Sequence, residues 1–432
     1  MLDILNIEGL MPEPEKSYED RERVVISISR RPNPEMRCRY CGAAAVPNGT
    51  RAVEYMDLPV RGKPTTLKWD RQRYICLNID SCRKSFSDDH EDLHPVRQMT
   101  WRLFNWIGQR SIDHTFVDVA ADVGLSERAV SSVFREWSEA QFADLEIITP
   151  RVLGLDEVHL LHRARLVLIN HGTNTVIDMR EKHTNEAVAA ALGSLSDPRR
   201  VRVVTIDMTA RYKNVIEEML PQAMIVVDKF HVVKEANNHL ETIRKSLRSG
   251  LPKERRVQLL KDRFLMLSRR KDLNPMQQLI IESWTNEFPQ MKEAYDAKEA
   301  FFDIWNHTTE KDARAAYMEW QRSLSTPNKA VFQPLINSMG RWHKEVFNYF
   351  RVPVSNGPTE AENGLIKIAN RTGRGYSFET LKAKVMLDRR AWVRRGGDND
   401  GKLAFDIPGP PPEVRFGVNV PTLERVLRED HQ

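Results

Sequence analysis

Two short apolar segments that each end in an aspartate constrain the fold of this 432-residue chain more than any other feature. Residues 152–156 (VLGLD) and 201–207 (VRVVTID) have the length and the content of β-branched residues that are typical of buried strands. Between them, residues 165–170 and 175–179 are predicted to pair as a hairpin. Residues 185–195 then follow a helical pattern. The first half of this region therefore predicts three strands, a helix and a fourth strand.

The same alternation continues after Asp207. A helix is predicted over residues 211–219, a strand over 224–228 and another helix from about Phe230. Three strands followed by alternating helices and strands is the order of a ribonuclease-H-like domain, with a different three-layer α/β enzyme as the alternative. From about residue 240 to 350 the patterns are helical, and four tryptophans are expected to pack the core there: Trp284, Trp305, Trp320 and Trp342.

All four cysteines lie in the first fifth of the chain, as Cys38-x-x-Cys41 and Cys76-x5-Cys82. Two strands, expected at 52–58 and 65–75, would bring the two pairs together at one end of a hairpin. Four thiolates at such a place form a tetrahedral site typical of structural zinc, whereas four free thiols are the alternative. The second pair is wider than the usual spacing, and His90 and His94 are spare ligand candidates.

Residues 116–134 (FVDVAADVGLSERAVSSVF) have the pattern of a helix-turn-helix. Ala120 allows two helices to cross closely, Gly124 suits the left-handed turn, and Ser126 can cap the second helix. That recognition helix, expected from Glu127 to Trp137, would present a DNA-binding face of Arg128, Ser131, Ser132 and Arg135. An ordinary helical hairpin has the same apolar spacing and is the alternative.

These segments predict a multidomain α/β chain with six parts. They are a zinc-binding β module (1–95), a helix-turn-helix domain (96–148), the first part of a ribonuclease-H-like catalytic domain (149–239), an all-helical insertion (240–350), the second part of the catalytic domain (351–395) and a C-terminal tail (396–432). Composition is that of a globular protein, with 41% hydrophobic and 29% charged residues.

Asp156 and Asp207 are predicted to follow neighbouring strands and so to point into one cleft. Two carboxylates this close cannot both ionise comfortably without a cation, and such hard oxygen ligands suit Mg²⁺ or Mn²⁺. Two other acids compete for a place there. Glu157 should point to the opposite face of its strand, and Asp228 is expected to cap the following helix.

The third metal ligand is expected on a helix that follows the turn signal at 355–358. Glu360 shares one polar face of this helix with Asn363, Lys367 and Arg371. Glu362 lies about 200° away, among apolar residues. Glu360 is the preferred third acid, and Glu362 stays open as the alternative.

Charge and hydropathy bear on the partners and the location of the protein. The net charge is only +5, but residues 241–272 contain eleven Lys or Arg against four Asp or Glu, which indicates a solvated helix face or, less favoured, a DNA contact. No stretch approaches the roughly 18 apolar residues that a membrane span requires. We therefore expect a cytoplasmic protein with no membrane partner.

Taken together, the motifs resemble the DDE transposases of the ISL-three insertion-sequence family. The resemblance covers most of the chain and rests on Gly154-Leu155-Asp156-Glu157, Ile206-Asp207-Met208 with Tyr212, Val227-Asp228-Lys229-Phe230-His231-Val232-Val233, and Ser355-Asn356-Gly357 to Glu360 with Asn363, Ile366-Lys367 and Arg371. The family's pattern has glycine after the catalytic glutamate, where this chain has Ala361, and Glu360 remains the best match.

The resemblance implies a catalytic triad of Asp156, Asp207 and Glu360 that holds two Mg²⁺ or Mn²⁺ ions. It also implies cutting and joining at the inverted repeats of an insertion sequence. The partners would be double-stranded DNA at the transposon ends and at the target, and further copies of the chain as a homodimer or larger assembly. Phosphate contacts are expected from Lys367, Arg371 and Arg374.

Two other functions are compatible with the same residues. One is a non-catalytic DNA-binding regulator that uses only the zinc and helix-turn-helix modules. The other is a structure-specific nuclease of the ribonuclease-H fold that cuts DNA without joining it to a target.

Overall fold

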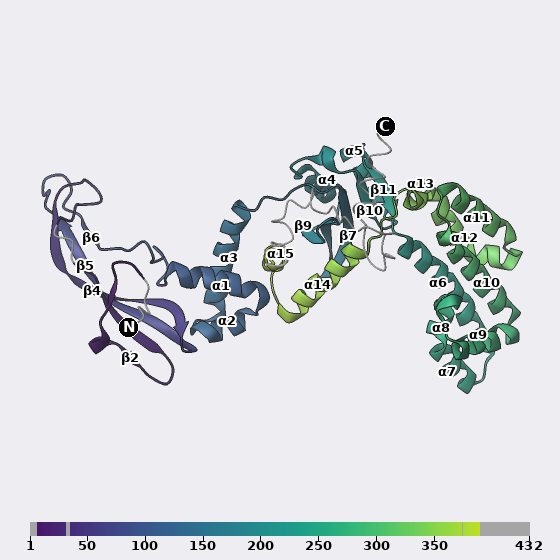
Figure 1. Cartoon of the computed structure of the whole chain (residues 1–432), viewed down its shortest axis with the longest axis horizontal. Coiled ribbons are helices and arrows are strands. Elements are labelled where there is room, and N and C mark those ends of the chain that lie inside the picture. The colour runs from purple at the N-terminus through teal and green to yellow at the C-terminus, as the bar shows by residue number, and fades with distance from the viewer. Residues whose placement is uncertain (1–6, 32–34, 374, 389–432) are drawn as a thin grey trace, which may run out of the picture. The chain divides into compact units, whose positions relative to one another are not determined.

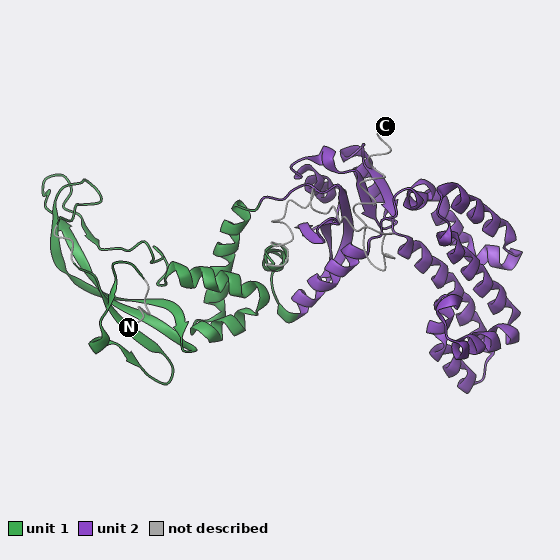
Figure 2. Ribbon diagram, viewed as in Figure 1, with its two compact units in different colours: residues 1–145, 372–388 green, residues 146–371, 389–432 purple. Residues whose placement is uncertain are grey.

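The computed structural model describes residues 7–31, 35–373 and 375–388 (Figure 1). They form two compact units (Figure 2). Unit 1 contains the described residues up to Leu145 together with Thr372–Asp388, and unit 2 runs from Glu146 to Arg371. The sequence suggested that residues 351–395 return as one piece to the α/β domain. The structure instead divides this segment after Arg371, and its last seven residues lie outside the described part.

The N-terminal part of unit 1 is a β module with one six-stranded sheet. Its centre is an antiparallel hairpin of β4 (Ala45–Val60) and β5 (Lys63–Cys76), with Arg61 and Gly62 at the turn in left-handed conformations. The predicted strands are thus present but longer than expected. Strand β3 (Val24–Ser29) runs parallel to β5, and short strands complete the sheet: β1 (Met11–Pro12), β2 (Tyr18–Glu19) and β6 (Ser85–Ser87).

Three helices follow in unit 1: α1 (Trp101–Asp113), α2 (Phe116–Val123) and α3 (Glu127–Ala143). Gly124 ends α2 in the left-handed region, with φ of 68°. The Ser126 hydroxyl accepts a hydrogen bond of 3.2 Å from the Ala129 N–H and so caps α3. Val130 and Val133 are fully buried. The predicted turn, cap and inward face are therefore confirmed as local structure.

Helix α15 (Phe378–Met386) completes the core of these three helices. Lys384 is buried, and its ammonium donates hydrogen bonds to the carbonyls of Ser111 and His114. The same ammonium lies 4.8 Å from the ring centre of Phe116. Burial lowers the pKa of Lys384 to about 7. These contacts explain why residues 372–388 belong to unit 1.

Replacing Gly124 by alanine is expected to lower the free energy of unfolding of unit 1 by about 2 kcal/mol, because a left-handed residue with a Cβ costs roughly 1–2 kcal/mol. The added Cβ would also come within 2.8 Å of two Pro64 carbons. Gly364 is the matched control, since it lies inside a helix with open space around it. Gly364→Ala should be neutral or slightly stabilising. Thermal denaturation followed by circular dichroism measures both, and equal melting temperatures for the two variants would contradict the expectation.

Unit 2 is built on a five-stranded sheet in the order β11-β10-β7-β8-β9. Strands β7 (Val152–Leu160), β8 (Arg163–Asn170) and β9 (Thr175–Arg180) are antiparallel neighbours. Strand β10 (Val203–Ile206) runs parallel to β7, and β11 (Met224–Val227) runs parallel to β10. Helices α4 (Asn185–Gly193), α5 (Ala210–Met219) and α6 (Lys229–Leu247) alternate with these strands as predicted.

The rest of unit 2 is helical, and α6 itself crosses the boundary expected at residue 240. The helices are α7 (Lys253–Lys261), α8 (Arg263–Leu267), α9 (Pro275–Glu287), α10 (Pro289–Asp303), α11 (Glu310–Ser323), α12 (Thr326–Arg341), α13 (His343–Phe347) and α14 (Gly357–Gly373). One hydrophobic core joins sheet residues such as Leu155 to helical residues such as Phe301 and Trp320. Trp284, Trp320 and Trp342 are buried, whereas Trp305 is half-buried. None of the helices in the described ranges is long and apolar enough to cross a bilayer.

Candidate functional site

Asp156 and Asp207 belong to the neighbouring strands β7 and β10, and both lie at the carboxyl end of the region where these strands pair. Asp207 directly follows β10, as predicted. Asp156 does not end its strand, because β7 continues to Leu160 as one arm of the hairpin with β8. Pairing of β7 with β10, however, stops at Gly154, which lies opposite Thr205. The prediction of a strand end was therefore wrong, but Asp156 still lies just beyond the parallel part of the sheet.

The electrostatic environment links the two aspartates to Glu360, in the first turn of α14. Burial raises the pKa of Asp156 to about 6, and the charges of Asp207 and Glu360 add to this shift. A 2.7 Å hydrogen bond from the Glu157 N–H and the charge of His231 oppose it. The charges of Asp207 and Glu360 thus disfavour the ionised form of Asp156.

Two further groups surround Glu360. The ligand atoms of Asp228, His231 and Glu360 lie within 4.8 Å of one another, and the His231 Nε2 is 4.0 Å from a Glu360 oxygen. Asp228 also caps α6, accepting a 3.1 Å hydrogen bond from the Phe230 N–H, as the sequence suggested. Burial raises the pKa of Glu360, and the charge of Asp228 adds to the shift. Sequence analysis assigned no role to His231, although its position one helical turn after a capping aspartate could have drawn attention to it.

The two competing glutamates have different surroundings. Glu157 accepts hydrogen bonds from the Tyr212 hydroxyl (2.6 Å) and from Arg211 (2.5 Å), which supports its predicted place on the other face of β7. Glu362 is buried on α14, with 8% of its surface exposed. On the same helix Asn363 donates a 2.8 Å hydrogen bond to Asp156 Oδ2.

A buried polar cluster connects the start of α14 to the sheet. The Thr359 hydroxyl lies 2.9 Å from His171 Nε2, and the Thr205 hydroxyl donates a 3.0 Å hydrogen bond to Asn356 Oδ1. Burial lowers the pKa of His171 to about 3, so this imidazole is neutral. A Cβ on Gly154 would lie 2.3 Å from both His171 and Thr359, which explains why the residue two positions before Asp156 is glycine. The cluster fixes where Glu360 can lie.

The carboxylate group has the chemistry of a divalent cation site. Asp207 Oδ1 is buried and has no hydrogen-bond partner among the described residues. Oxygen atoms of this kind, left without a donor beside other carboxylates, match the ligands that Mg²⁺ and Mn²⁺ prefer. The residues therefore fit a hard metal ion.

The raised pKa of Asp156 predicts how stability depends on pH in protein that keeps its zinc but is prepared without Mg²⁺ or Mn²⁺. The folded state holds this proton up to about pH 6, whereas the unfolded chain releases it near the ordinary pKa of 3.8. The stabilisation is therefore complete below the unfolded pKa and is lost as pH rises through about 6, by at most about 3 kcal/mol. Urea denaturation across this range should show a weaker decline for Asp156→Asn. Identical pH profiles for wild type and variant would contradict this assignment.

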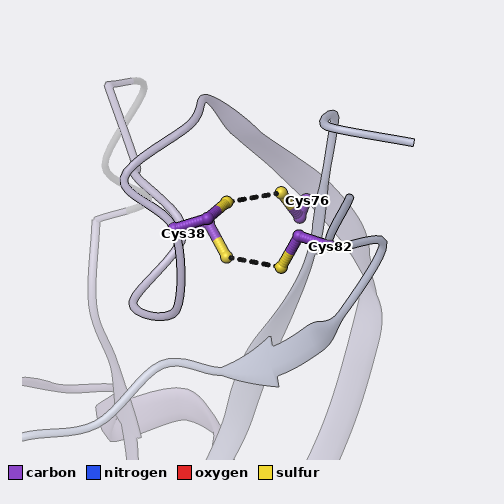
Figure 3. Close-up of side chains that lie close together, drawn as sticks. Cys38, Cys76 and Cys82 are labelled. Atoms are coloured by element: carbon purple, nitrogen blue, oxygen red, sulfur yellow. Dashed lines mark hydrogen bonds between the residues drawn. The ribbon is translucent and has the colours of Figure 1, made fainter. Parts of the chain in front are cut away.

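In unit 1 the four cysteines come together as the sequence predicts. Figure 3 shows three of them, Cys38, Cys76 and Cys82. The sulfurs of Cys38 and Cys82 lie 3.8 Å apart, and those of Cys41 and Cys76 lie 3.5 Å apart. Tetrahedral zinc with Zn–S bonds of about 2.3 Å places its sulfurs roughly 3.8 Å from one another. His90 Nε2 instead contacts the Glu8 carbonyl, and His94 lies 3.3 Å from Glu136, so neither histidine joins the cluster.

The predicted DNA-binding residues differ in exposure. Arg128 and Arg135 are exposed on α3, and Lys367 and Arg371 are exposed on α14. Ser131 is half-buried. The Ser132 hydroxyl accepts a 2.9 Å hydrogen bond from Arg97, an arrangement that the sequence pattern did not reveal. Arg374 lies outside the described residues.

Comparisons with known proteins place these sites in a family. The family described as "Transposase", of the ISL3 group with a DDE domain, matches residues 153–385. A second, the "zinc-finger of transposase IS204/IS1001/IS1096/IS1165", matches residues 34–82, which contain all four cysteines.

Curated relatives agree with this match. The chain is 23% identical over 362 residues to the "Transposase for insertion sequence element IS1001" of Bordetella parapertussis, which covers 81% of this chain and 88% of the relative. It is 22% identical over 285 residues to the "Transposase for insertion sequence element IS1557" of Mycobacterium tuberculosis, which covers 59% of this chain and 64% of that relative. The first family match spans more than half of the sequence and contains Asp156, Asp207 and Glu360. The chain therefore belongs to the ISL3 family of DDE transposases.

Proposed function

We propose that the chain binds the terminal inverted repeats of an insertion sequence, cuts the DNA there and joins the cut ends to a target. Two observations carry this proposal. Asp156 and Asp207 lie where the parallel pairing of β7 and β10 ends, and the charges of Asp207 and Glu360 contribute to the raised pKa of Asp156. The topology of unit 2 supports a ribonuclease-H-like catalytic domain. Three antiparallel strands precede two parallel ones, and the aspartates lie at the edge where parallel pairing ends.

Asp156, Asp207 and Glu360 would hold two Mg²⁺ ions, with Mn²⁺ as a substitute. Bound there, the ions would activate the attacking oxygen and stabilise the leaving oxygen of an in-line displacement at phosphorus. The neighbouring residues prepare the carboxylates for this role. Asn363 holds one oxygen of Asp156 through its amide, and the cluster around His171 fixes the helix that carries Glu360.

DNA recognition would be divided between two surfaces. We propose that α2 and α3 form a helix-turn-helix and that Arg128 and Arg135 reach the DNA from α3. Ser131 and Ser132 would contribute from the same helix, Ser132 after release from Arg97. Lys367 and Arg371 are exposed on the helix of Glu360, where contact with phosphates would position the strand to be cut, and Arg374 is proposed to act with them.

The four cysteines would hold a structural zinc ion, because four protein ligands leave no open position for chemistry. We further propose that the active form is a homodimer or a larger assembly, since two transposon ends have to be joined in one event.

A single reaction tests the proposed function. It contains the purified chain, labelled DNA carrying the ends of the element, Mg²⁺ and a target plasmid. The expected products are cut ends and ends joined to the plasmid. Binding without cutting would favour the regulator, and cutting without joining would favour the structure-specific nuclease.

A further inference from the structure

A cavity of about 360 Å³ opens beside the carboxylates of unit 2. Its walls come from the α/β part of the unit and from the helical insertion. The start of α6 contributes Phe230 and Val233, and the helical insertion contributes Phe302 and Trp305. Ser355 lies just before α14, and Glu360 lies in its first turn. A volume in the range of about 300–1,000 Å³ with mainly apolar walls is typical of a site for a small organic group.

One aromatic wall of the cavity is held in place by neighbouring rings. Trp305 stacks on Phe350 with ring centres 5.5 Å apart and an interplanar angle of 8°, and Tyr349 packs edge-on against it. Phe230 lies in the first turn of α6, two residues after Asp228, and its side chain is 51% exposed. A rigid indole and an exposed phenyl ring beside one cavity favour a planar ligand that can stack on aromatic faces.

Two hydrogen-bond donors in the lining lack acceptors. The Trp305 Nε1 and the Arg269 Nε are both buried and have no hydrogen-bond partner among the described residues. The rest of the Arg269 guanidinium is fixed by an ion pair with Asp303, so the orphaned N–H is not free to turn to solvent. Buried donors of this kind are costly unless an acceptor reaches them. Satisfying them from the cavity requires a small movement of either side chain and a ligand with carbonyl or ring-nitrogen acceptors.

A second cation completes the lining. The Lys229 ammonium lies 4.7 Å from the centre of the Tyr349 ring and donates a 2.8 Å hydrogen bond to its hydroxyl. Lys229 and Arg269 thus add positive charge to a cavity that Asp228 and Glu360 also line. Positive side chains beside the proposed catalytic carboxylates can contact phosphate groups. They therefore suit a ligand that is attached to a sugar-phosphate chain.

We propose that this cavity binds a single nucleobase, unpaired from the DNA end next to the cleavage site. The inference rests on the proposed function and assigns a role to the helical insertion that composition alone did not indicate. A base extruded from a duplex loses its stacking and pairing, and a cavity with aromatic walls and buried donors offsets that loss. Extrusion would also hold the adjacent phosphodiester close to Glu360, which lines the same cavity.

Photocrosslinking with 5-iodouracil tests the proposal without relying on cutting. The analogue replaces one base at a time around the cleavage site of the terminal-repeat duplex. The Asp207→Asn chain keeps the complex uncut, and Asp207 does not line the cavity. Because the photoreaction favours aromatic side chains in contact with the base, we expect one DNA position to crosslink to the peptide containing Phe230 or the peptide containing Trp305. Mass spectrometry identifies that peptide.

A kinetic comparison of two exposed aromatic residues supplies the second measurement. Phe230→Ala should slow cutting of a matched duplex roughly tenfold, because stacking on one base is lost. Placing a mismatch at the crosslinked position should restore most of the rate, since that base no longer has to be unpaired. The control is Phe264→Ala on α8, whose side chain is 70% exposed and does not line the cavity, and which should cut at the wild-type rate.

The outcomes separate this proposal from the function on which it rests. Normal cutting and joining by the wild-type chain, with crosslinks only to other peptides, would overturn the nucleobase site and leave the transposase intact. A Phe230→Ala defect that the mismatch does not relieve would also count against an extruded base. Failure of the wild-type chain to cut and join at all would instead refute the proposed function.

Discussion

A Glu360→Gln chain should bind terminal-repeat DNA as tightly as the wild type but cut it at least about a thousandfold more slowly. The amide keeps the size of the side chain and removes the charge that would hold a metal ion. Metal ions contribute several kcal/mol to such displacements, and each 1.4 kcal/mol is about a factor of ten in rate. The charge of Glu360 also helps to raise the pKa of Asp156, so the variant should lower that pKa below about 6. Single-turnover cutting and titration of the metal-free protein measure the two effects.

Glu362→Gln is the matched control on the same helix. Glu362 is 8% exposed and lies about 200° around α14 from Glu360. Loss of a buried charge should lower the melting temperature while most of the cutting activity remains. The opposite pattern, with Glu362→Gln inactive and Glu360→Gln active, would exchange their roles.

Replacing Cys76 by serine is expected to remove the zinc ion and unfold the β module of unit 1. Cys76 is buried, and its sulfur lies 3.5 Å from that of Cys41. Zinc binding contributes on the order of 10 kcal/mol to the folding of small metal modules, which far exceeds what this end of the sheet can supply through its few buried side chains. Zinc analysis should fall from about one ion per chain to none. The melting transition of unit 1 should weaken, while that of unit 2 stays unchanged.

Ser81→Ala provides the comparison, because Ser81 is exposed beside Cys82 and offers no ligand atom to the cluster. It should retain zinc and the full melting profile. If Cys76→Ser keeps its zinc, the four sulfurs are not the site, and the wide spacing between Cys76 and Cys82 would be the first feature to reconsider.

Local signals in the sequence predicted much of the fold. The order of strands and helices in unit 2 was correct because each strand is apolar and each helix has a clear period. The position of Asp156 within β7 was missed because the β7–β8 turn uses Leu161 and His162 with positive φ, where no glycine or asparagine marks a turn. A strand that continues past the parallel part of its sheet leaves no signature in composition.

The environment of the site was harder to predict than its acids. Thr359 contacts His171 from 188 residues away, and Asn363 contacts Asp156 from 207 residues away. Only the tertiary fold reveals such pairs. His231 and the aromatic cavity were missed for the same reason, since Phe230 and Trp305 look like ordinary core residues in sequence.

The return of α15 to unit 1 has a consequence for how such proteins can diversify. Because the core of α1, α2 and α3 is completed by residues 372–388, the unit proposed to read DNA is not a continuous stretch of gene. Exchanging only the first 145 codons between two transposases would combine helices α1, α2 and α3 of one protein with helix α15 of the other. The hydrogen bonds from Lys384 to the carbonyls of Ser111 and His114 would then have to form between residues of different origin. Inheritance of a new DNA specificity by simple end-to-end recombination is therefore obstructed. Gradual substitution on the surface of α3 remains the open route.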